Sequence, residues 1–592
     1  MGRSATQQNA ESFLERLQHE AKFLSYEQIE SINNALAKAT VVLHEAHNER
    51  SPLFKLPVEI LHKILELVPD SCTKRWKRYH PFWRNTLTDS SMLIPVTHTC
   101  HRLREVALAH PHLWATFQTS FKKPSLIRQM ATWGEHAPLN AVGSDVGILN
   151  ELPPNTRFRS IHLYDIGKHC NNLRAFVEQS SSVALSSFSL LCNETYDWDS
   201  KEAALPLSLA HASNIRDLTL DEVRALPDNG FPSLTHLALL NVSAHDFHAR
   251  VISFIRECPR LQSVALSEFS LQFEGEDVTN DPAPIPLKHL KHVTLIDFSP
   301  DALTYYLALL QPGVCGSSVE ILAYHAKDRS FPRRFLLPPD SQERQTQVTV
   351  CIGVHPTGLG DYSVSLTTVF AHTTRRIASW VLQLGTNGIP SFQWPSMVFS
   401  DHATSPWTVD EVWLYGVGSS SSPWKRSPLQ LFPRARTIVL VAEGGSHHDG
   451  PPNLRLLPFV PVADSDSESE SEPIGITTLR IVHGFREYDG LCEFACSNGA
   501  DSGHACRGEA HRERVPLGRL IRDLGSGGYG YLRHFVLQVT PHVYVDGKEL
   551  EVLRNLGNFE TFRFERIKEV PDMPGQSDPA YRGGERYPGA LW

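Results

Sequence analysis

Short apolar runs with the alternation of β-strands recur through the middle of the chain, and their spacing constrains the fold more than any other feature. Aligned on one aliphatic residue each, the runs follow one another in steps of 27, 30, 19, 27, 29 and 26 residues, at Leu163, Leu190, Leu220, Leu239, Leu266, Leu295 and Ile321. Helices are predicted between some of them, at residues 173–177, 251–255 and 302–310. The middle of the chain is therefore predicted to repeat a strand and a connecting helix.

Repeats of about 20–29 residues that each hold a strand and a helix are typical of leucine-rich-repeat solenoids. The pattern is clearest at residues 258–266, where Leu261, Val264 and Leu266 are spaced like the apolar ladder of such a repeat. The asparagine or cysteine expected a few positions later is generally absent. The predicted repeats are therefore degenerate.

After Ala323 the pattern becomes hard to follow and then returns. Further strands are predicted around residues 350, 364–366, 412–414, 438–440, 479–481, 535–537 and 562–564, with a helix at 549–556. A solenoid accepts insertions of this size between repeats, because each repeat contacts only its neighbours. A separate α/β domain over residues 330–592 is the alternative.

Residues 56–68 have the pattern of a short amphipathic helix. Pro57 suits the first helical position, because its φ is fixed near the helical value and its missing N–H would have no partner there. The apolar residues recur at intervals of three and four, which predicts one apolar stripe made of Ile60, Leu61, Ile64, Leu65 and Val68. A second helix is predicted at residues 96–107, followed by Pro111-His112-Leu113-Trp114.

These segments together resemble an F-box, especially the F-box-like segments of fungal proteins. The resemblance covers residues 51–120 and rests on Leu-Pro-x-Glu-Ile-Leu-x-x-Ile-Leu from Leu56, on the helix that contains Cys100, and on Pro-x-Leu-Trp at residues 111–114. The chain departs from the family at residues 70–94, an insertion where the family usually has a short turn. The predicted fold class is thus α+β, an N-terminal helical F-box-like bundle followed by an irregular leucine-rich-repeat-like α/β solenoid at residues 121–567.

The resemblance implies a substrate-recognition subunit of a cullin–RING (SCF-type) E3 ubiquitin ligase, which performs no chemistry itself. The bundle would bind the adaptor, and through it the cullin, while the repeats would bind an unknown protein substrate. The implied bundle and adaptor-facing residues are Leu56, Pro57, Ile60, Leu61, Ile64, Leu65, Val68, Leu103, Leu113 and Trp114. The alternative is a non-catalytic repeat scaffold whose F-box-like bundle packs internally or binds other partners.

Residues 9–49 have helical apolar spacing with a break near Ser25, which predicts one long helix or two within an N-terminal segment, residues 1–50. The apolar repeat is short and irregular for a coiled coil. Because a lone amphipathic helix cannot bury its own stripe, we expect this segment to pack on its own chain rather than on a partner helix.

Composition excludes several classes of protein. A net charge of −9 over 592 residues gives no basic field for nucleic acid. No run approaches the ~20 apolar residues that a membrane span needs, and the N-terminus lacks the apolar core of a secretory signal. The 10 cysteines are widely spread, which favours reduced thiols and a cytoplasmic and/or nuclear location.

Two patterns could indicate a cofactor, and neither predicts one. Gly525–Gly530 matches Gly-x-Gly-x-x-Gly, but a predicted helix precedes it and a predicted strand follows, the reverse of a dinucleotide-binding turn. Five potential zinc ligands occur within twenty residues, at Cys492, Cys496, His504, Cys506 and His511. The paired two-residue gaps of zinc fingers are missing there, which favours free thiols and leaves structural zinc as the alternative.

Three polar stretches are predicted to be solvated. Residues 463–473 alternate serine with acidic residues, so they form a disordered loop or a target for an acidophilic kinase. Residues 74–79 form a basic and aromatic loop that could alternatively contact an acidic partner. Residues 568–592 are rich in proline, glycine and charge, which predicts a flexible tail.

Overall fold

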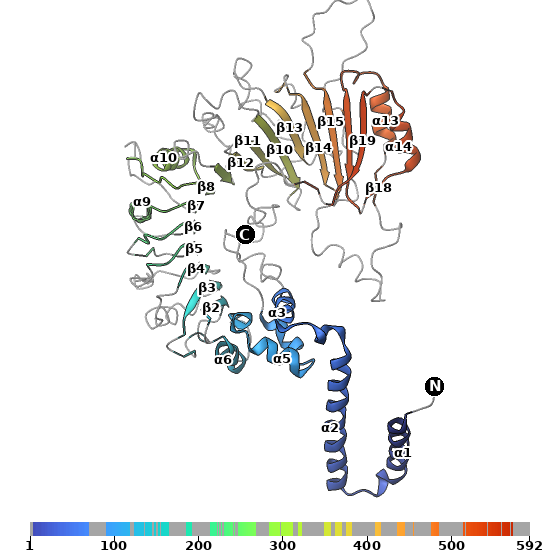
Figure 1. Cartoon of the computed structure of the whole chain (residues 1–592). Coiled ribbons are helices and arrows are strands. Elements are labelled where there is room, and N and C mark those ends of the chain that lie inside the picture. Colours follow the sequence, from blue (N-terminus) through green and yellow to red (C-terminus); the bar gives the residue numbers. More distant parts are fainter. Residues whose placement is uncertain are drawn as a thin grey trace, which may run out of the picture. The chain divides into compact units, whose positions relative to one another are not determined.

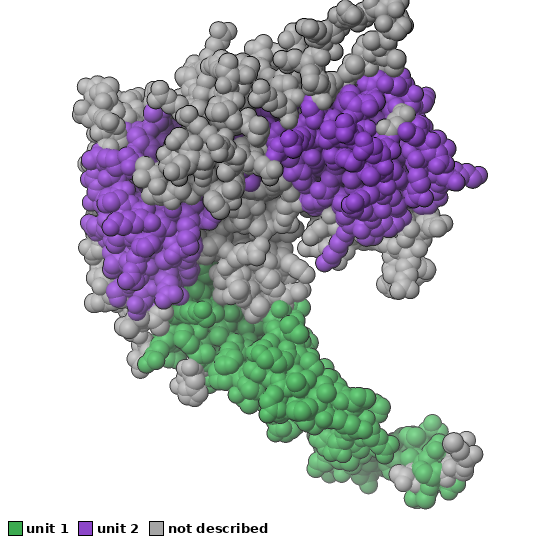
Figure 2. All heavy atoms as spheres, turned by 45° about the horizontal axis from the view of Figure 1, so that its top comes forward, with its two compact units in different colours: residues 1–77, 85–163, 179–184 green, residues 78–84, 164–178, 185–592 purple. Residues whose placement is uncertain are grey.

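A computed structural model gives an α+β protein in which N-terminal helices precede a mostly parallel sheet (Figure 1). The chain divides into two compact units, residues 1–77, 85–163 and 179–184 in one and residues 78–84, 164–178 and 185–592 in the other (Figure 2). Apart from a few isolated positions, the structure describes residues 4–69, 90–118, 124–134, 137–144, 156–164, 185–191, 213–221, 230–240, 247–267, 283–296, 298–311, 318–322, 348–356, 362–369, 374–381, 409–415, 435–443, 475–484, 513–515, 517–541, 543–557, 559–568 and 570–571.

The first unit begins with two helices, α1 (Ala5–Glu20) and α2 (Tyr26–Arg50). They separate at the predicted break, because Ser25 starts α2 with a capping box. The Ser25 hydroxyl accepts a hydrogen bond from the Gln28 N–H at 3.3 Å, and the Gln28 side chain accepts one from the Ser25 N–H at 2.9 Å. The prediction of a soft break is confirmed, and the segment is two helices.

The expectation that this segment packs on its own chain is wrong for α2. None of the residues of α2 is buried, and Ile29, Leu36 and Leu43 are exposed along it. Phe13 and Leu14 of α1 are exposed as well. Helical spacing predicted these two helices correctly, but it did not predict whether anything covers their apolar residues.

The first unit continues with short helices, and their boundaries differ from the predicted ones. Their bounds are η2 (Pro52–Lys55), α3 (Val58–Leu67), η3 (Ser90–Met92), α4 (Leu93–Thr97), α5 (His101–Leu108), η4 (Pro111–Trp114) and α6 (Pro124–Trp133). Pro57 caps α3 with an extended ψ of 152°, so the helix begins one residue later than predicted. The single helix predicted at residues 96–107 is wrong, because extended Cys100 separates α4 from α5 and its Sγ accepts a hydrogen bond from the Leu103 N–H at 3.4 Å.

The first unit ends with three strands that pair in parallel, β1 (Thr116–Gln118), β2 (Leu139–Gly143) and β3 (Phe158–Tyr164). Of these, only β3 was predicted. Phe117 of β1 packs near Phe158 of β3, with ring centroids 6.5 Å apart, and both side chains are buried.

The second unit contains the strands that the residue spacing predicted. Their bounds are β4 (Ser187–Leu191), β5 (Asp217–Asp221), β6 (His236–Leu240), β7 (Ser263–Ser267), β8 (His292–Ile296) and β9 (Ser318–Leu322). Each pairs in parallel with the next, and the spaced residues are direct register partners, in the order Leu190, Leu220, Leu239, Leu266, Leu295 and Ile321. All six side chains are buried.

The later strands continue this sheet around an antiparallel meander. Their bounds are β10 (Val348–Pro356), β11 (Tyr362–Val369), β12 (Thr374–Val381), β13 (Val409–Tyr415), β14 (Thr437–Glu443), β15 (Thr478–Gly484), β17 (His534–Val539) and β19 (Thr561–Arg566). In space β9 is followed by β12, β11 and β10, and β10 pairs in parallel with β13, from which parallel pairing continues to β19. Strands on both sides of residue 330 thus belong to one sheet.

The register of the earlier strands continues through the meander to the last strand. The partners after Ile321 are Ile377, Leu366, Ile352, Leu414, Leu440, Ile481, Leu537 and Phe564. We call the aliphatic part of this series, from Leu190 to Leu537, the aliphatic column. Because side chains alternate along a strand, the residues beside the column point to the opposite face of the sheet.

Helices lie between some of the strands, at α9 (Phe247–Arg256), α10 (Pro300–Leu310), α13 (Leu517–Gly525) and α14 (Gly547–Arg554). All four were predicted, whereas the helix predicted at residues 173–177 lies outside the described residues. A small parallel pair, β16 (Glu513–Arg514) with β18 (Val543–Tyr544), was not predicted. Among the helices that the structure describes, none has the length and hydropathy to cross a membrane.

Candidate functional site

Helix α3 has two apolar faces rather than the single stripe that its sequence predicts. Leu61 and Leu65 are 0% and 1% exposed. On the other side, Ile60, Ile64 and Leu67 are 46%, 37% and 84% exposed. The intervals of four and three residues place these three side chains on one side of the helix, and exposed Pro57 precedes them by one turn. We call Pro57, Ile60, Ile64 and Leu67 the exposed stripe.

The buried face of α3 is held by a core from α5 and η4. Leu103 in α5 and Leu113 in η4 are buried, and α3 packs on α5. Trp114 is fully buried, and its indole N–H donates a hydrogen bond to the Ala107 carbonyl at 2.8 Å. Its ring lies 4.6 Å from that of Trp133 in α6. The Trp114 contacts tie α5, η4 and α6 together, and α3 is held through its packing on α5.

Arg102 of α5 fixes the segment that leads into α3. Its guanidinium donates hydrogen bonds to the carbonyls of Phe54 and Leu56, the latter at 3.2 Å. One planar side chain thus provides hydrogen-bond donors for two backbone carbonyls before the helix. The consequence is a defined position for Pro57 at the beginning of the exposed stripe.

A histidine cluster lies against the polar side of α3. The rings of His62 and His110 stack with centroids 3.5 Å apart, and the His112 ring lies 5.9 Å from His62. Glu66 Oε1 is 3.6 Å from His62 Nε2. Burial lowers the pKa of His62, and the neighbouring His110 lowers it further, while Glu66 acts in the opposite direction. The arrangement therefore favours a neutral imidazole at residue 62.

The ten residues that the resemblance assigned to the bundle and its surface separate into two sets. Pro57, Ile60 and Ile64 are exposed, and Leu56 and Val68 are half-buried. The remaining five form the core, namely Leu61, Leu65, Leu103, Leu113 and Trp114. Exposed Leu67 was missed by the sequence analysis, although its spacing from Ile60 and Ile64 could have indicated it. The histidine cluster was missed as well, because its members are up to fifty residues apart in sequence.

The glycine-rich pattern is a helix-to-strand loop, as predicted. Helix α13 ends at Gly525, Gly527 has a φ of +81°, and β17 begins at His534. A positive φ at this position suits glycine, which has no Cβ. The order of elements remains the reverse of a dinucleotide-binding turn.

Several predicted features lie outside the described residues. These are the cysteine and histidine group at residues 492–511, the acidic loop at 463–473, the basic cluster at 74–79, most of the insertion at 70–94 and the end of the tail. Within the described residues, no group of three or more His, Cys, Asp or Glu side chains is placed to hold a metal ion. Cys258 is a buried free thiol, and burial raises its pKa to about 11.

Comparison of the chain with protein-family models and with curated proteins gave no match.

Proposed function

We propose that this protein is the substrate-recognition subunit of an SCF-type E3 ubiquitin ligase, and that the exposed stripe of α3 binds the adaptor. The observation that carries the proposal is the pair of apolar faces on α3. One face is buried in its own helical module, while Ile60, Ile64 and Leu67 remain exposed on the other. Exposed apolar residues on one side of a fixed helix are typical of a surface that binds another protein.

The exposed stripe offers enough apolar surface for a helix-in-groove interface. Fully burying an aliphatic side chain contributes about 1.5–3 kcal/mol before the costs of association. Three such side chains at helical spacing are the usual anchors of an amphipathic helix in a groove. The cullin would be recruited through the adaptor, and the chain would supply no catalytic group.

We further propose that residues 121–567 are a degenerate leucine-rich-repeat-like solenoid that holds a protein substrate. The aliphatic column supports this reading, because successive parallel strands with one aliphatic residue in a common register are what such repeats produce. The proposed location is cytoplasmic and/or nuclear, with neither nucleic acid nor a membrane as a partner.

The test is recovery of the adaptor by the tagged full-length chain from cell extract. We expect the wild type to recover adaptor and cullin, and Ile60→Asp with Ile64→Asp to reduce recovery at least tenfold, because two charges would be buried in the interface. Leu36→Asp is the matched control, since it places a charge on an exposed apolar position of α2. Circular dichroism confirms that each variant is folded.

Absence of the adaptor from the wild-type sample would contradict the proposal. The alternative function is a non-catalytic scaffold, and the exposed apolar residues of α1 and α2 favour it as an additional binding surface. A scaffold would recover other proteins without adaptor or cullin, and in that case Leu36→Asp rather than the α3 variant would reduce recovery.

A further inference from the structure

Strand β19 has a free edge. It pairs with β17 on one side, and among the described strands no ladder continues the sheet on the other. The N–H groups of Thr561 and Ile567 donate hydrogen bonds toward β17, at 3.1 and 2.9 Å. Because backbone groups alternate between the two sides of a strand, those of Phe562, Phe564 and Arg566 point away from β17. The free edge therefore presents three N–H and three C=O groups to a further strand.

The side chains of β19 are open as well. In β17 the register partners Phe535 and Leu537 are both 0% exposed. Opposite them in β19, Phe562 and Phe564 are only half-buried. The rings of Phe535 and Phe562 stack with centroids 5.6 Å apart, so the row of buried side chains ends in β19 with one side uncovered. A further strand at this edge would bury more of both phenylalanines.

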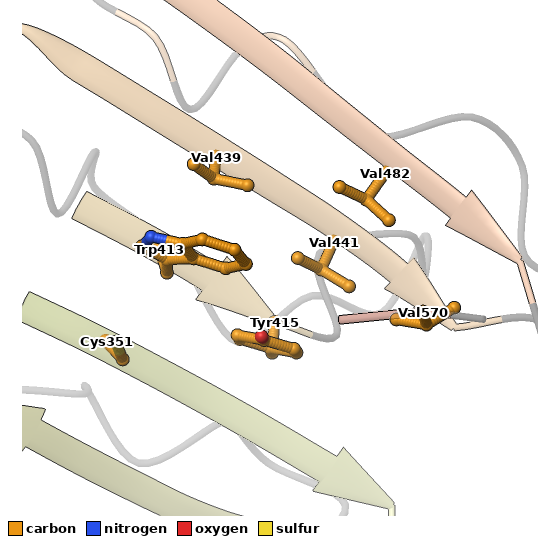
Figure 3. Packing of buried hydrophobic residues seen from close by; sticks show 7 residues of the cluster. All are labelled: Cys351, Trp413, Tyr415, Val439, Val441, Val482 and Val570. Carbon is orange, nitrogen blue, oxygen red and sulfur yellow. The ribbon is translucent and has the colours of Figure 1, made fainter. Parts of the chain in front are cut away.

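The segment that follows β19 leads away from its free edge. Val570 is 3% exposed in a cluster on the face of the sheet opposite the aliphatic column. Figure 3 shows Val570 beside Tyr415 and Val441, on a segment separate from their strands. The Tyr415 hydroxyl donates a hydrogen bond to the Pro571 carbonyl at 3.2 Å. These contacts direct residues 567–571 toward β13 and β14, which lie on the β17 side of β19.

Two opposite charges lie on one face of β19. Arg563 is exposed and Glu565 is half-buried, two residues apart and so on the same face. The Gln538 amide donates a hydrogen bond to Glu565 Oε2 at 2.6 Å, which fixes the place of the carboxylate. A carboxylate accepts several hydrogen bonds, so Oε1 can receive a second donor. On the other face the Arg566 guanidinium lies 5.9 Å from the centre of the Phe564 ring.

This edge is complementary to itself when two copies run antiparallel. With Phe564 opposite Phe564 of the second copy, Phe562 lies opposite Arg566 of that copy. All three residues direct their backbone groups outward, so each pair can exchange two hydrogen bonds. Arg563 then lies directly opposite Glu565 of the second copy, in a pair without backbone hydrogen bonds, where side chains approach most closely.

The neighbouring registers lack this complementarity. In one of the two that keep outward-pointing residues opposite each other, Arg563 meets Arg563 of the second copy. In the other, Glu565 meets Glu565. Like charges directly opposite each other are unfavourable in an antiparallel pair. The backbone groups and the charges of β19 therefore favour the same single register.

We propose that the free edge of β19 binds the same edge of a second copy of this chain, so that two sheets join into one. Each feature of the edge has its complement in the same strand, which is why the partner is a second copy. Because β19 has only six residues, the interface is smaller than that of a permanent dimer, and the association should be reversible. This inference does not depend on what α3 binds.

Charge reversal tests the proposal, with sedimentation velocity of the full-length chain at low salt. The wild type should change from monomer to dimer as its concentration rises. Arg563→Glu and Glu565→Arg should each raise the dissociation constant at least tenfold, because like charges then meet twice in every dimer. The double variant exchanges the charges in both copies and should return to within threefold of the wild type.

This rescue is specific to self-association, since the charges of any other partner would not change with those of the chain. Lys548→Glu is the matched control, because it reverses an exposed charge on α14. It should dimerise like the wild type, and circular dichroism checks that every variant is folded.

The register is tested with an equal mixture of Arg563→Cys and Glu565→Cys chains. Opposite residues of such a pair have Cα atoms about 4.5 Å apart, a distance that a disulfide can span. The mixture should therefore form a linked dimer faster than either chain alone, and equal rates would contradict the register.

A wild type that stays monomeric, or a double variant as weak as the single ones, would overturn the proposal. A dimer that none of these variants changes would also overturn it, and would assign association to another surface, such as the exposed apolar residues of α2. Recovery of the adaptor through α3 should be the same in the wild type and in Arg563→Glu. A failure here is thus distinguishable from a failure of the proposed ligase function.

Discussion

Helices α2 and α3 have similar apolar spacing and opposite environments. In α3, Leu61 and Leu65 are buried, whereas α2 has no buried residue. The difference comes from distant residues. Arg102 of α5 binds the segment before α3, and His110, which precedes η4, stacks on His62 of α3. Periodicity alone thus predicts the helix, and contacts from elsewhere in the chain determine whether its apolar side is covered.

The largest difference between the two helices is expected when one leucine side chain in each is replaced by alanine. Leu65→Ala should lower the free energy of opening of α3 by about 2–5 kcal/mol, because it leaves a cavity in a packed core. Leu36→Ala in α2 should change the corresponding value by less than about 0.5 kcal/mol, because that side chain is exposed. Hydrogen exchange measured by mass spectrometry reports both. Equal effects would mean that α2 is covered in solution.

A smaller loss of stability in α3 is expected when the hydrogen bonds from Arg102 of α5 to the segment before α3 are removed. Arg102→Ala should weaken protection of the first turn of α3 by about 1 kcal/mol, a value reduced for the exposure of the guanidinium. Arg102→Lys is the control, because an ammonium keeps the charge but cannot reach both carbonyls with a planar fork. If the lysine variant matched the wild type, charge rather than fork geometry would be responsible.

The stability of α2 should depend instead on contacts within its own first turn. Ser25→Ala removes the capping box and should lower the local stability of the first turn of α2 by about 1 kcal/mol. Hydrogen exchange of residues 26–30 measures it, and exchange in α3 should be unchanged. A loss of protection that spread into α3 would show that the two helices are coupled.

The smallest expected effect is a dependence of helix stability on pH. It should be seen in α3 and not in α2, because of the two only α3 contacts the histidine cluster. The folded state lowers the pKa of His62, first through burial and then through His110, so the unfolded chain takes up the proton more readily. Stability from this group is therefore complete above the unfolded pKa of 6.5 and decreases as pH falls through that value toward the folded pKa.

Hydrogen exchange in α3 should consequently become faster between pH 7.5 and pH 5.5, after correction for the intrinsic rate. The slope should be smaller in His62→Gln, which has no charge to gain. Lys63 and Glu66 on α3 and His110 and His112 beside it also face His62, so His112→Gln serves as a second variant. An unchanged slope in His62→Gln would assign the titration to the neighbours.

The strands were more predictable than the site, for a physical reason. Alternation of apolar residues is local, and Leu220 or Leu266 marks a strand whatever its neighbour is. Strand β12 was missed because Arg375, Arg376 and Ser379 interrupt its apolar pattern, and its place becomes evident only when Ile377 pairs with Ile321. Strand β1 has only three residues, too few to show alternation.

The division of α3 into two faces could not be predicted, because it depends on where the chain returns some fifty residues later. Leu61 and Ile60 are equally apolar and adjacent in sequence, yet one is 0% and the other 46% exposed. Only the core that Leu103, Leu113 and Trp114 complete distinguishes them. The resemblance to an F-box assigned residues of both faces to one set without separating them.

The aliphatic column also limits how the length of this protein can vary. A residue inserted between two strands lengthens a connection and leaves the pairing intact. A residue inserted within a strand, next to Leu440 for example, would move every later side chain of that strand to the opposite face. Because Val439 and Val441 are buried on the opposite face, both faces of the sheet would then have to repack. Natural length variation should therefore be confined to the segments between the strands.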